Sequence, residues 1–138
     1  MSEIQTVNPT LIGISTQTTY LPTHSRPEES QYTFAYTITI SNAGDCAVQL
    51  LSRQWEITDA DGKVQEVRGE GVVGEQPIIL PGRFFRYTSG ATLPTEVGFM
   101  RGIYTMIPHA DAGTPDTPAQ TFDVAIPAFT LHTPTSLN

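Results

Sequence analysis

The sequence predicts an all-β protein folded as an antiparallel β-sandwich. Three observations favour this fold: short runs rich in β-branched and aromatic residues, turn-forming residues between those runs, and no segment with apolar residues at helical spacing. Gly and Pro are plentiful, with eleven of each, as expected for a chain with many turns. A β-barrel is the alternative, because the number of strands does not separate the two architectures.

The clearest strand signal is the run YTFAYTITI over residues 32–40. Aromatic and Ile side chains occupy every second position, which predicts a strand with one buried face. A strand over residues 10–21 precedes it, and the polar, Pro-broken residues 22–30 predict a loop between the two. The turn-forming residues 41–45 lead into a third strand over residues 47–57.

The second half of the chain begins with a predicted hairpin. Asp61-Gly62 stands between two strand-like runs, so residues 63–69 are expected to pair with the preceding strand. Pro127 lies within the last run, which predicts an edge strand or a strand with a bulge. The remaining expected strands cover residues 77–80, 83–89, 99–107 and 121–133, with a turn at 81–82 and a polar loop at 108–120.

Length, charge and cysteine content limit the function. The 138 residues suffice for one domain, which we expect to span residues 1–138. The net charge is −7 and the seven basic residues form no cluster, which argues against nucleic-acid binding and against binding to anionic membranes. A single Cys, no signal-peptide pattern and no apolar run near ~20 residues predict a cytoplasmic protein with no membrane role.

One segment carries a ligand-binding pattern. Gly69, Gly71 and Gly74 form a literal G-x-G-x-x-G, the spacing that binds a dinucleotide when it lies between a strand and a helix. Pro77 and Pro81 follow, and no helix fits between them. The dinucleotide-binding fold is therefore excluded by the context of the motif.

Three explanations of these glycines remain. The backbone N–H groups of the loop could bind an anion such as pyrophosphate, assisted by Arg68. Alternatively, the glycines only permit positive φ and close backbone approach at a bulged connection between the sheets, which is the explanation that we favour. If Val72 and Val73 are exposed at the loop tip, they would form a protein contact patch.

Metal binding finds little support in the sequence. Asp59 and Asp61 resemble the start of a calcium loop, but the further acidic positions are absent, so a hairpin turn is favoured. His109, Asp111 and Asp116 lie on one loop that could bind a divalent cation weakly, although a solvated loop is the simpler expectation. The three histidines are scattered at positions 24, 109 and 132, without a ligand-pair spacing.

No catalytic constellation is apparent. The chain lacks G-x-S-x-G, and Ser89 is expected to end a strand. Cys46 has no catalytic signature and is expected to be a small, half-buried residue. Trp55 should fill the core, and Arg53 shares its face, either as a charge at the strand edge or as a polar group reaching the neighbouring loop. We therefore expect no enzyme, no cofactor and no resident metal.

Residues 49–90 resemble the ApaG family of small bacterial proteins, and residues 26–42, 98–106 and 122–131 extend the match over most of the chain. The resemblance implies an immunoglobulin-like or fibronectin type III-like β-sandwich. It also implies a cytoplasmic protein whose family name is tied to cobalt and magnesium efflux phenotypes. The family's Gly-rich motif, discussed as a pyrophosphate site, falls on Gly69, Gly71 and Gly74.

These observations lead to three hypotheses. We favour a non-enzymatic interaction module that binds a protein partner and affects metal resistance indirectly. The alternative is a pyrophosphate- or nucleotide-binding protein using Arg68 and the loop residues Gly69, Gly71, Val72, Val73 and Gly74. Direct binding of a divalent metal is the third hypothesis, and pairing of edge strands would allow a homodimer.

Overall fold

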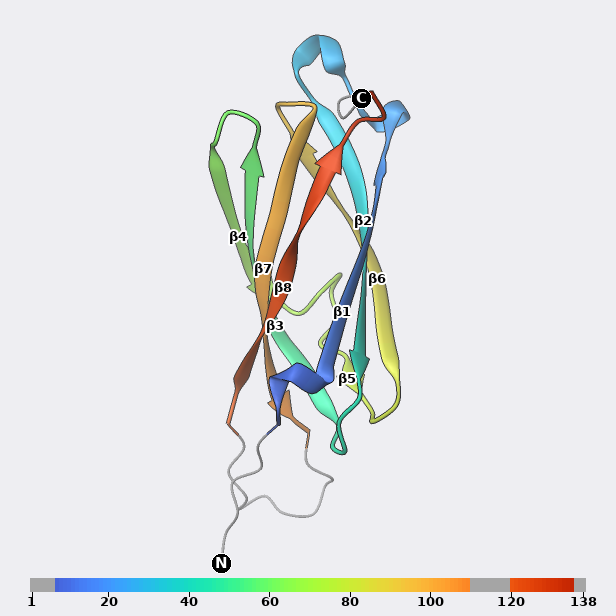
Figure 1. Cartoon of the computed structure of the whole chain (residues 1–138), viewed down its shortest axis with the longest axis vertical. Helices are drawn as coiled ribbons and strands as arrows, with labels where there is room; N and C mark the ends of the chain where they lie inside the picture. Colours follow the sequence, from blue (N-terminus) through green and yellow to red (C-terminus); the bar gives the residue numbers. More distant parts are fainter. Residues whose placement is uncertain (1–6, 110–119, 136–138) are drawn as a thin grey trace, which may run out of the picture.

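The structure is a computed structural model that describes residues 7–109 and 120–135. In this part of the chain, eight strands form two antiparallel sheets that pack against each other as a β-sandwich (Figure 1). The smaller sheet has the order β1-β2-β6, with β1 at Ile12–Tyr20, β2 at Tyr32–Asn42 and β6 at Phe84–Leu93. The predicted all-β sandwich is confirmed.

The larger sheet has the order β4-β3-β7-β8, and the short strand β5 also pairs with β3. Its strands are β3 (Val48–Asp59), β4 (Val64–Glu70), β5 (Ile78–Ile79), β7 (Val97–Pro108) and β8 (Phe122–His132). Three short 3-10 turns, Pro9–Leu11, Pro22–His24 and Pro27–Glu29, flank β1 and lie in the loop before β2.

The alternation in residues 32–40 correctly identifies the buried face of β2. Phe34, Tyr36, Ile38 and Ile40 are buried between the sheets. Threonines on the opposite face of β2 pair with threonines of β6, for example through the 2.7 Å hydrogen bond between the hydroxyls of Thr37 and Thr88. The period of two places one apolar face inward, which is the pattern of a half-buried strand.

The hairpin at Asp61-Gly62 is confirmed, with a loop of three residues. The N–H of Asp59 donates to the Lys63 carbonyl, and Gly62 takes a φ of 82°, as a type I turn with a Gly bulge requires. The Asp59 carboxylate accepts hydrogen bonds from the N–H groups of Asp61 and Lys63, at 2.8 and 3.1 Å. This carboxylate therefore shapes the turn, in agreement with the preference for a turn over a calcium loop.

Two further expectations concern the strands β8 and β6. Pro127 lies in β8, which is an edge strand, and the β7–β8 register shifts between Met100 and Gly102, so both predicted features of this strand are present. By contrast, the expectation that Ser89 ends a strand is wrong. β6 continues to Leu93 because Gly90 fits the ladder opposite Ala35, and the chain reverses only after Pro94.

The core joins the two sheets through aromatic side chains. Trp55 is 1% exposed and stands edge-on to Tyr36 and Phe129, with ring centroids 5.5 and 5.9 Å apart, so its predicted core position is confirmed. The hydroxyls of Tyr87, on β6, and Tyr104, on β7, share a buried hydrogen bond. Burial raises the pKa of both phenols, because the charged phenolate would be poorly solvated there.

Candidate functional site

The Gly-rich loop interrupts a single sheet edge. β4 pairs with residues 52–58 of β3, and β5 pairs with residues 48–49 of the same strand. The chain therefore leaves the edge of β3 after Glu70 and returns to it at Ile78. The expected connection between the two sheets is wrong in this respect, because both flanking strands belong to the larger sheet.

The tip of the loop is a tight two-residue turn. Val72 and Glu75 exchange both of their backbone hydrogen bonds, at 2.8 and 2.9 Å. Val73 and Gly74 between them have φ values of 44° and 80°. Positive φ at both central positions is the requirement of a type I′ turn. Val73 is a β-branched residue in a left-handed conformation, which costs of order 1–3 kcal/mol.

Gly71 anchors the loop to the bulge in β3. The β3–β7 register shifts between Leu50 and Ser52, which leaves Leu51 as the extra residue. The Leu51 carbonyl accepts the N–H of Gly71 at 2.8 Å and the side-chain amide of Gln76 at 2.9 Å. A Cβ at Gly71 would lie 2.1 Å from the Glu75 carbonyl oxygen, so this position cannot hold a larger residue without moving the loop.

Arg53 holds the loop from the inner side of the sheet. Its Nη1 donates to the carbonyls of Glu70 and Gly71, at 3.1 and 2.8 Å. The guanidinium packs over Gly69, where an added Cβ would lie 2.8 Å from Nη1. Of the two expectations for Arg53, the polar group that reaches the loop is the one observed.

These hydrogen bonds limit what the loop can offer to an anion. The N–H groups of Gly71, Val72 and Glu75 all donate to protein carbonyls. The charge of Arg53 is directed at two further carbonyls. An anion-binding concavity needs N–H groups that are free to converge on the ligand. Of the donors proposed from the sequence, the N–H groups of Gly71 and Val72 are already in use.

The two valines of the loop have different environments. Val72 is fully buried and belongs to the core, so the condition for a contact patch, that both valines are exposed, is not met. Val73 is 53% exposed, as expected for a loop tip. The tight turn separates them: the bonded pair Val72–Glu75 points Val72 inward, and only the central residues of the turn extend into solvent. A contact patch made of both valines is thereby excluded.

Arg68 lies outside the loop, on the exposed face of β4. It lines a shallow hollow of about 380 Å³. The structure thus brings Arg68, Arg53 and Gly69 together, with the carboxylate-bearing Glu70 in the same lining. The other lining residues are Ser52, Gln54 and Thr105.

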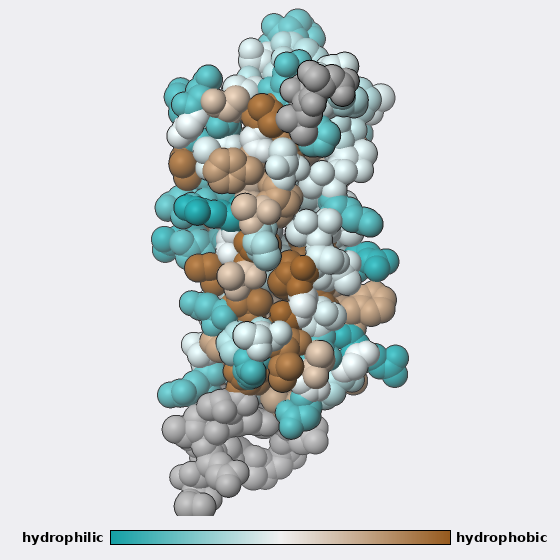
Figure 2. Space-filling view, in the orientation of Figure 1, coloured by the Kyte–Doolittle hydropathy of each residue, from teal (hydrophilic) through white to brown (hydrophobic). Residues whose placement is uncertain are grey.

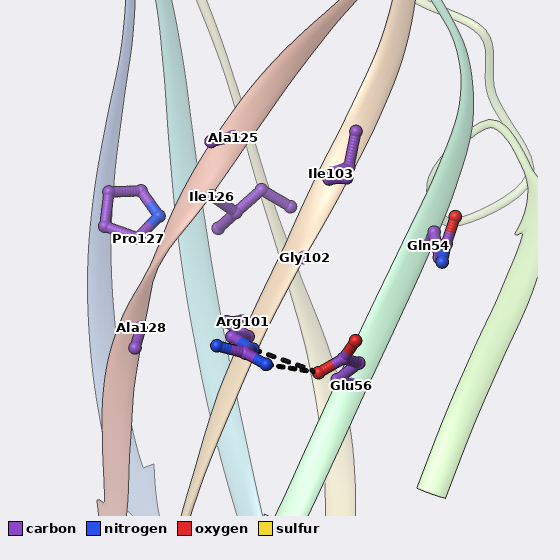
Figure 3. A pocket seen from close by; sticks show the side chains of 9 residues that line it. All are labelled: Gln54, Glu56, Arg101, Gly102, Ile103, Ala125, Ile126, Pro127 and Ala128. Carbon is purple, nitrogen blue, oxygen red and sulfur yellow. Dashed lines mark hydrogen bonds and ion pairs between the residues drawn. The ribbon is translucent and has the colours of Figure 1, made fainter.

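A second hollow, of about 460 Å³, lies on the solvent side of the larger sheet (Figure 3). Its floor combines apolar side chains of β7 and β8 with the bulge at Pro127-Ala128. On one side, Arg101 and Glu56 form an ion pair in which Nη2 and Nε each lie 3.0 Å from Oε2. The lining residues are Gln54, Glu56, Arg101, Gly102, Ile103, Ala125, Ile126, Pro127 and Ala128.

This hollow was not found by sequence reasoning. Ile103 and Phe99 occupy outward positions of β7 and are 37% and 39% exposed. Figure 2 shows hydrophobic side chains gathered along the middle of one face of the molecule, over the region of β8 and β1, with hydrophilic side chains along its margins. The sequence of β7 has apolar residues on both faces, which could have indicated this hollow. The same pattern is typical of a strand that is buried on both faces, so it does not distinguish the two cases.

The remaining candidate residues add no site. Cys46 is half-buried, and burial together with the nearby Asp45 charge raises the pKa of its thiol. Asp111 and Asp116 lie outside the described residues. Within residues 7–109 and 120–135, no group of three His, Cys, Asp or Glu side chains is arranged to hold a metal ion, and no helix could cross a membrane.

Comparison with known proteins gives one consistent result. The ApaG domain family matches residues 22–108. Protein ApaG of Pseudomonas aeruginosa is 50% identical over 127 residues, covering 92% of this chain and 94% of that protein, and Protein ApaG of Thiobacillus denitrificans is 53% identical with the same coverage.

The solved structures agree. A Bordetella pertussis protein described as an ApaA protein is 43% identical, with a TM-score of 0.80 over 91% of this chain and 95% of that one. Sequence identity of this extent and a shared fold over nearly the whole chain have one explanation. The chain belongs to the ApaG family.

Proposed function

We propose that this protein is a non-enzymatic, cytoplasmic interaction module that binds a partner protein at the hollow beside Ile103. The observation that carries the proposal is an apolar concavity on the solvent-facing side of the larger sheet, bordered by the ion pair of Arg101 and Glu56. Apolar anchors in pockets, surrounded by polar groups, are the usual centres of protein interfaces. The partner would insert an apolar side chain against Ile103, Ala125 and Pro127, and would meet Arg101 and Glu56 at the margin.

Any effect on cobalt or magnesium resistance would then act through the partner. Recognition of a partner requires no metal site, and among the described residues no three His, Cys, Asp or Glu side chains are arranged to form one. The chain's part would be to recognise the partner.

The test compares two variants that add the same charge to opposite sheets. Ile103→Glu places a carboxylate in the hollow, whereas Gln17→Glu places one on the exposed face of β1. Both variants and the unmodified protein are immobilised, exposed to a bacterial lysate and analysed by quantitative mass spectrometry, after thermal melts have shown that they fold.

We expect one protein to be retained by the unmodified chain and by Gln17→Glu. Ile103→Glu should retain at least about tenfold less of it, which corresponds to a loss of roughly 1.4 kcal/mol in binding free energy. The retained protein, once purified, should bind with the same ranking of the three chains. A partner that binds all three chains equally would show that the hollow is not its site.

Pyrophosphate or nucleotide binding is the second candidate, and the exposed Arg68, which lines the hollow at Gly69, supports it. It is tested by recording amide spectra while pyrophosphate, ATP and magnesium are added. Saturable shifts at Arg53, Arg68 and Gly69, reduced in Arg68→Ala, would establish this site. Unchanged spectra at millimolar ligand would remove it.

A further inference from the structure

We propose that the free edge of β6, over residues 88–93, accepts an extended segment of a partner protein as an added β-strand beneath the β3–β4 hairpin. This edge lies away from the residues that line the Ile103 hollow, so the inference goes beyond the proposed function. It rests on the unequal width of the two sheets, on the unprotected character of β6 and on a hollow between the sheets at this edge.

The sandwich is closed on one side and open on the other. On the closed side, β1 lies beside β8, where the Thr18 hydroxyl donates to the Thr130 carbonyl at 3.4 Å. Across the core, Tyr87 of β6 reaches Tyr104 of β7. β6, the last strand of the smaller sheet, therefore faces β7 and does not extend over β4, which is the outermost strand of the larger sheet. One strand position next to β6, facing β4, is left unfilled.

In immunoglobulin domains, which are also β-sandwiches, a strand can occupy this position. Constant-type immunoglobulin domains have four strands in the corresponding sheet, in the order A-B-E-D, and β6 corresponds to strand E by its place in the chain. Variable-type domains add strands to the opposite sheet and remain intact sandwiches. A strand beside β6 is therefore compatible with a strand such as β4 on the other sheet.

β6 lacks the features that usually protect an edge. It pairs with β2 at ten consecutive positions without a register shift. Residues 88–93 contain no Pro and no charged residue, whereas β4 carries Glu66, Arg68 and Glu70. Within the described chain, no hydrogen bond outside the β2–β6 ladder uses a backbone group of residues 84–93. A long, regular edge with free N–H and C=O groups is a template for an additional strand.

A hollow between the sheets would receive the side chains of that strand. It measures about 260 Å³ and is lined by residues of both sheets, including Ile57, Val64 and Gln65 on one side and Leu93 and Pro94 on the other. Ala91 and Val67 are also half-buried and pack against the core. Because side chains alternate along a strand, every second residue of the added segment would be apolar and would point toward these groups.

The geometry favours a single extended segment over a second copy of this chain. A copy that offered its own β6 would bring its β3–β4 hairpin into the space that this chain's hairpin occupies. The charge of the strand favours an acidic segment, because residues 84–93 carry Arg86 and no acidic residue. The hollow contains Asp59 and Lys63, whose charges are opposite, so it adds no preference of its own. The predicted ligand alternates apolar and acidic residues.

The test uses two libraries of eight-residue peptides with Val, Ile, Leu or Phe at alternate positions and either Glu or Lys between them. We expect the Glu library to bind better and to protect the amides of residues 88–93 from hydrogen exchange. Ala91→Lys, which points a charge inward at the edge, should weaken binding at least about tenfold. Gln17→Lys and Ile103→Glu should leave peptide binding unchanged, which separates this site from the Ile103 hollow.

A control within the peptide does not depend on how a variant folds. N-methylation of those residues whose N–H groups face β6 should abolish binding, and N-methylation of the alternate residues should not. Failure of both libraries to bind, protection of a different edge, or equal effects of the two N-methylation patterns would overturn the proposal.

Discussion

At Gly71, two constraints coincide in one residue. Its φ of 62° lies in the left-handed region, and an added Cβ would approach the Glu75 carbonyl oxygen to 2.1 Å. Gly74 has a φ of 80°, but a Cβ added there would meet no atom within 4 Å, so only the conformational constraint applies. The two glycines of one motif are thus needed for different reasons.

This difference predicts unequal effects of the same substitution. Gly74→Ala should lower the free energy of unfolding by about 1 kcal/mol, the cost of a left-handed Ala. Gly71→Ala should cost roughly 2–5 kcal/mol, because steric overlap with the backbone is added to the same strain. Urea denaturation of both variants measures the difference. Equal losses would show that the close approach at Gly71 is relieved without cost.

At the scale of the element, the turn between Val72 and Glu75 contains a residue that does not suit its conformation. Type I′ turns favour Asn-Gly at their central positions, and this one has Val-Gly. Val73 is exposed, so its side chain gains little burial in return. Such a conflict between residue and conformation is more common at functional positions.

We therefore expect Val73→Asn to stabilise the fold by roughly 1 kcal/mol, through relief of strain in the turn. Val72→Asn, one position earlier, should instead destabilise it by several kcal/mol, because it buries an amide in the core. Thermal and urea unfolding of the two variants provide the measurement. A loss of stability in Val73→Asn would mean that the valine makes stabilising contacts at the loop tip.

At the scale of the whole molecule, buried polar contacts join the two sheets, and the hydrogen bond between Tyr87 and Tyr104 is one of them. Tyr87 and Tyr104 satisfy each other's hydroxyls between β6 and β7. Removal of one hydroxyl leaves the other without this partner, whereas removal of both leaves no buried polar group at this point. The pair therefore acts as a unit that stabilises the packing of the two sheets against each other.

The raised pKa values of these tyrosines predict a loss of stability in alkali. In the unfolded chain the phenols titrate near pH 10, and in the folded protein their pKa values are higher. Their contribution is thus complete below about pH 10 and is lost as the pH rises above it, because the unfolded state then releases protons that the folded state retains.

Urea denaturation at pH 8 and near pH 11 tests this prediction. The unmodified protein should lose more stability between the two values than the Tyr87→Phe, Tyr104→Phe double variant. At pH 8, Tyr104→Phe alone should cost roughly 1–3 kcal/mol, and the second substitution should add little or restore part of it. Identical pH dependence in the two proteins would contradict the assignment.

The sequence correctly predicted those structural features that depend on residues adjacent in the chain. Alternation in residues 32–40 predicted the buried face of β2, Asp61-Gly62 predicted the hairpin, and Pro127 predicted an irregular edge strand. It also excluded a dinucleotide-binding helix after Gly74, because Pro77 and Pro81 act on their immediate neighbours.

The sequence by itself therefore determined the all-β class, the strands and the failure of the G-x-G-x-x-G motif as a helix-linked phosphate site. Only the tertiary structure decided that Val72 is buried, that Arg53 and the Leu51 carbonyl occupy the loop's polar groups, and that hollows form beside Ile103 and at the edge of β6. The physical reason is distance along the chain. Turns and alternation depend on adjacent residues, whereas burial and concavity depend on which strands, far apart in sequence, are packed together.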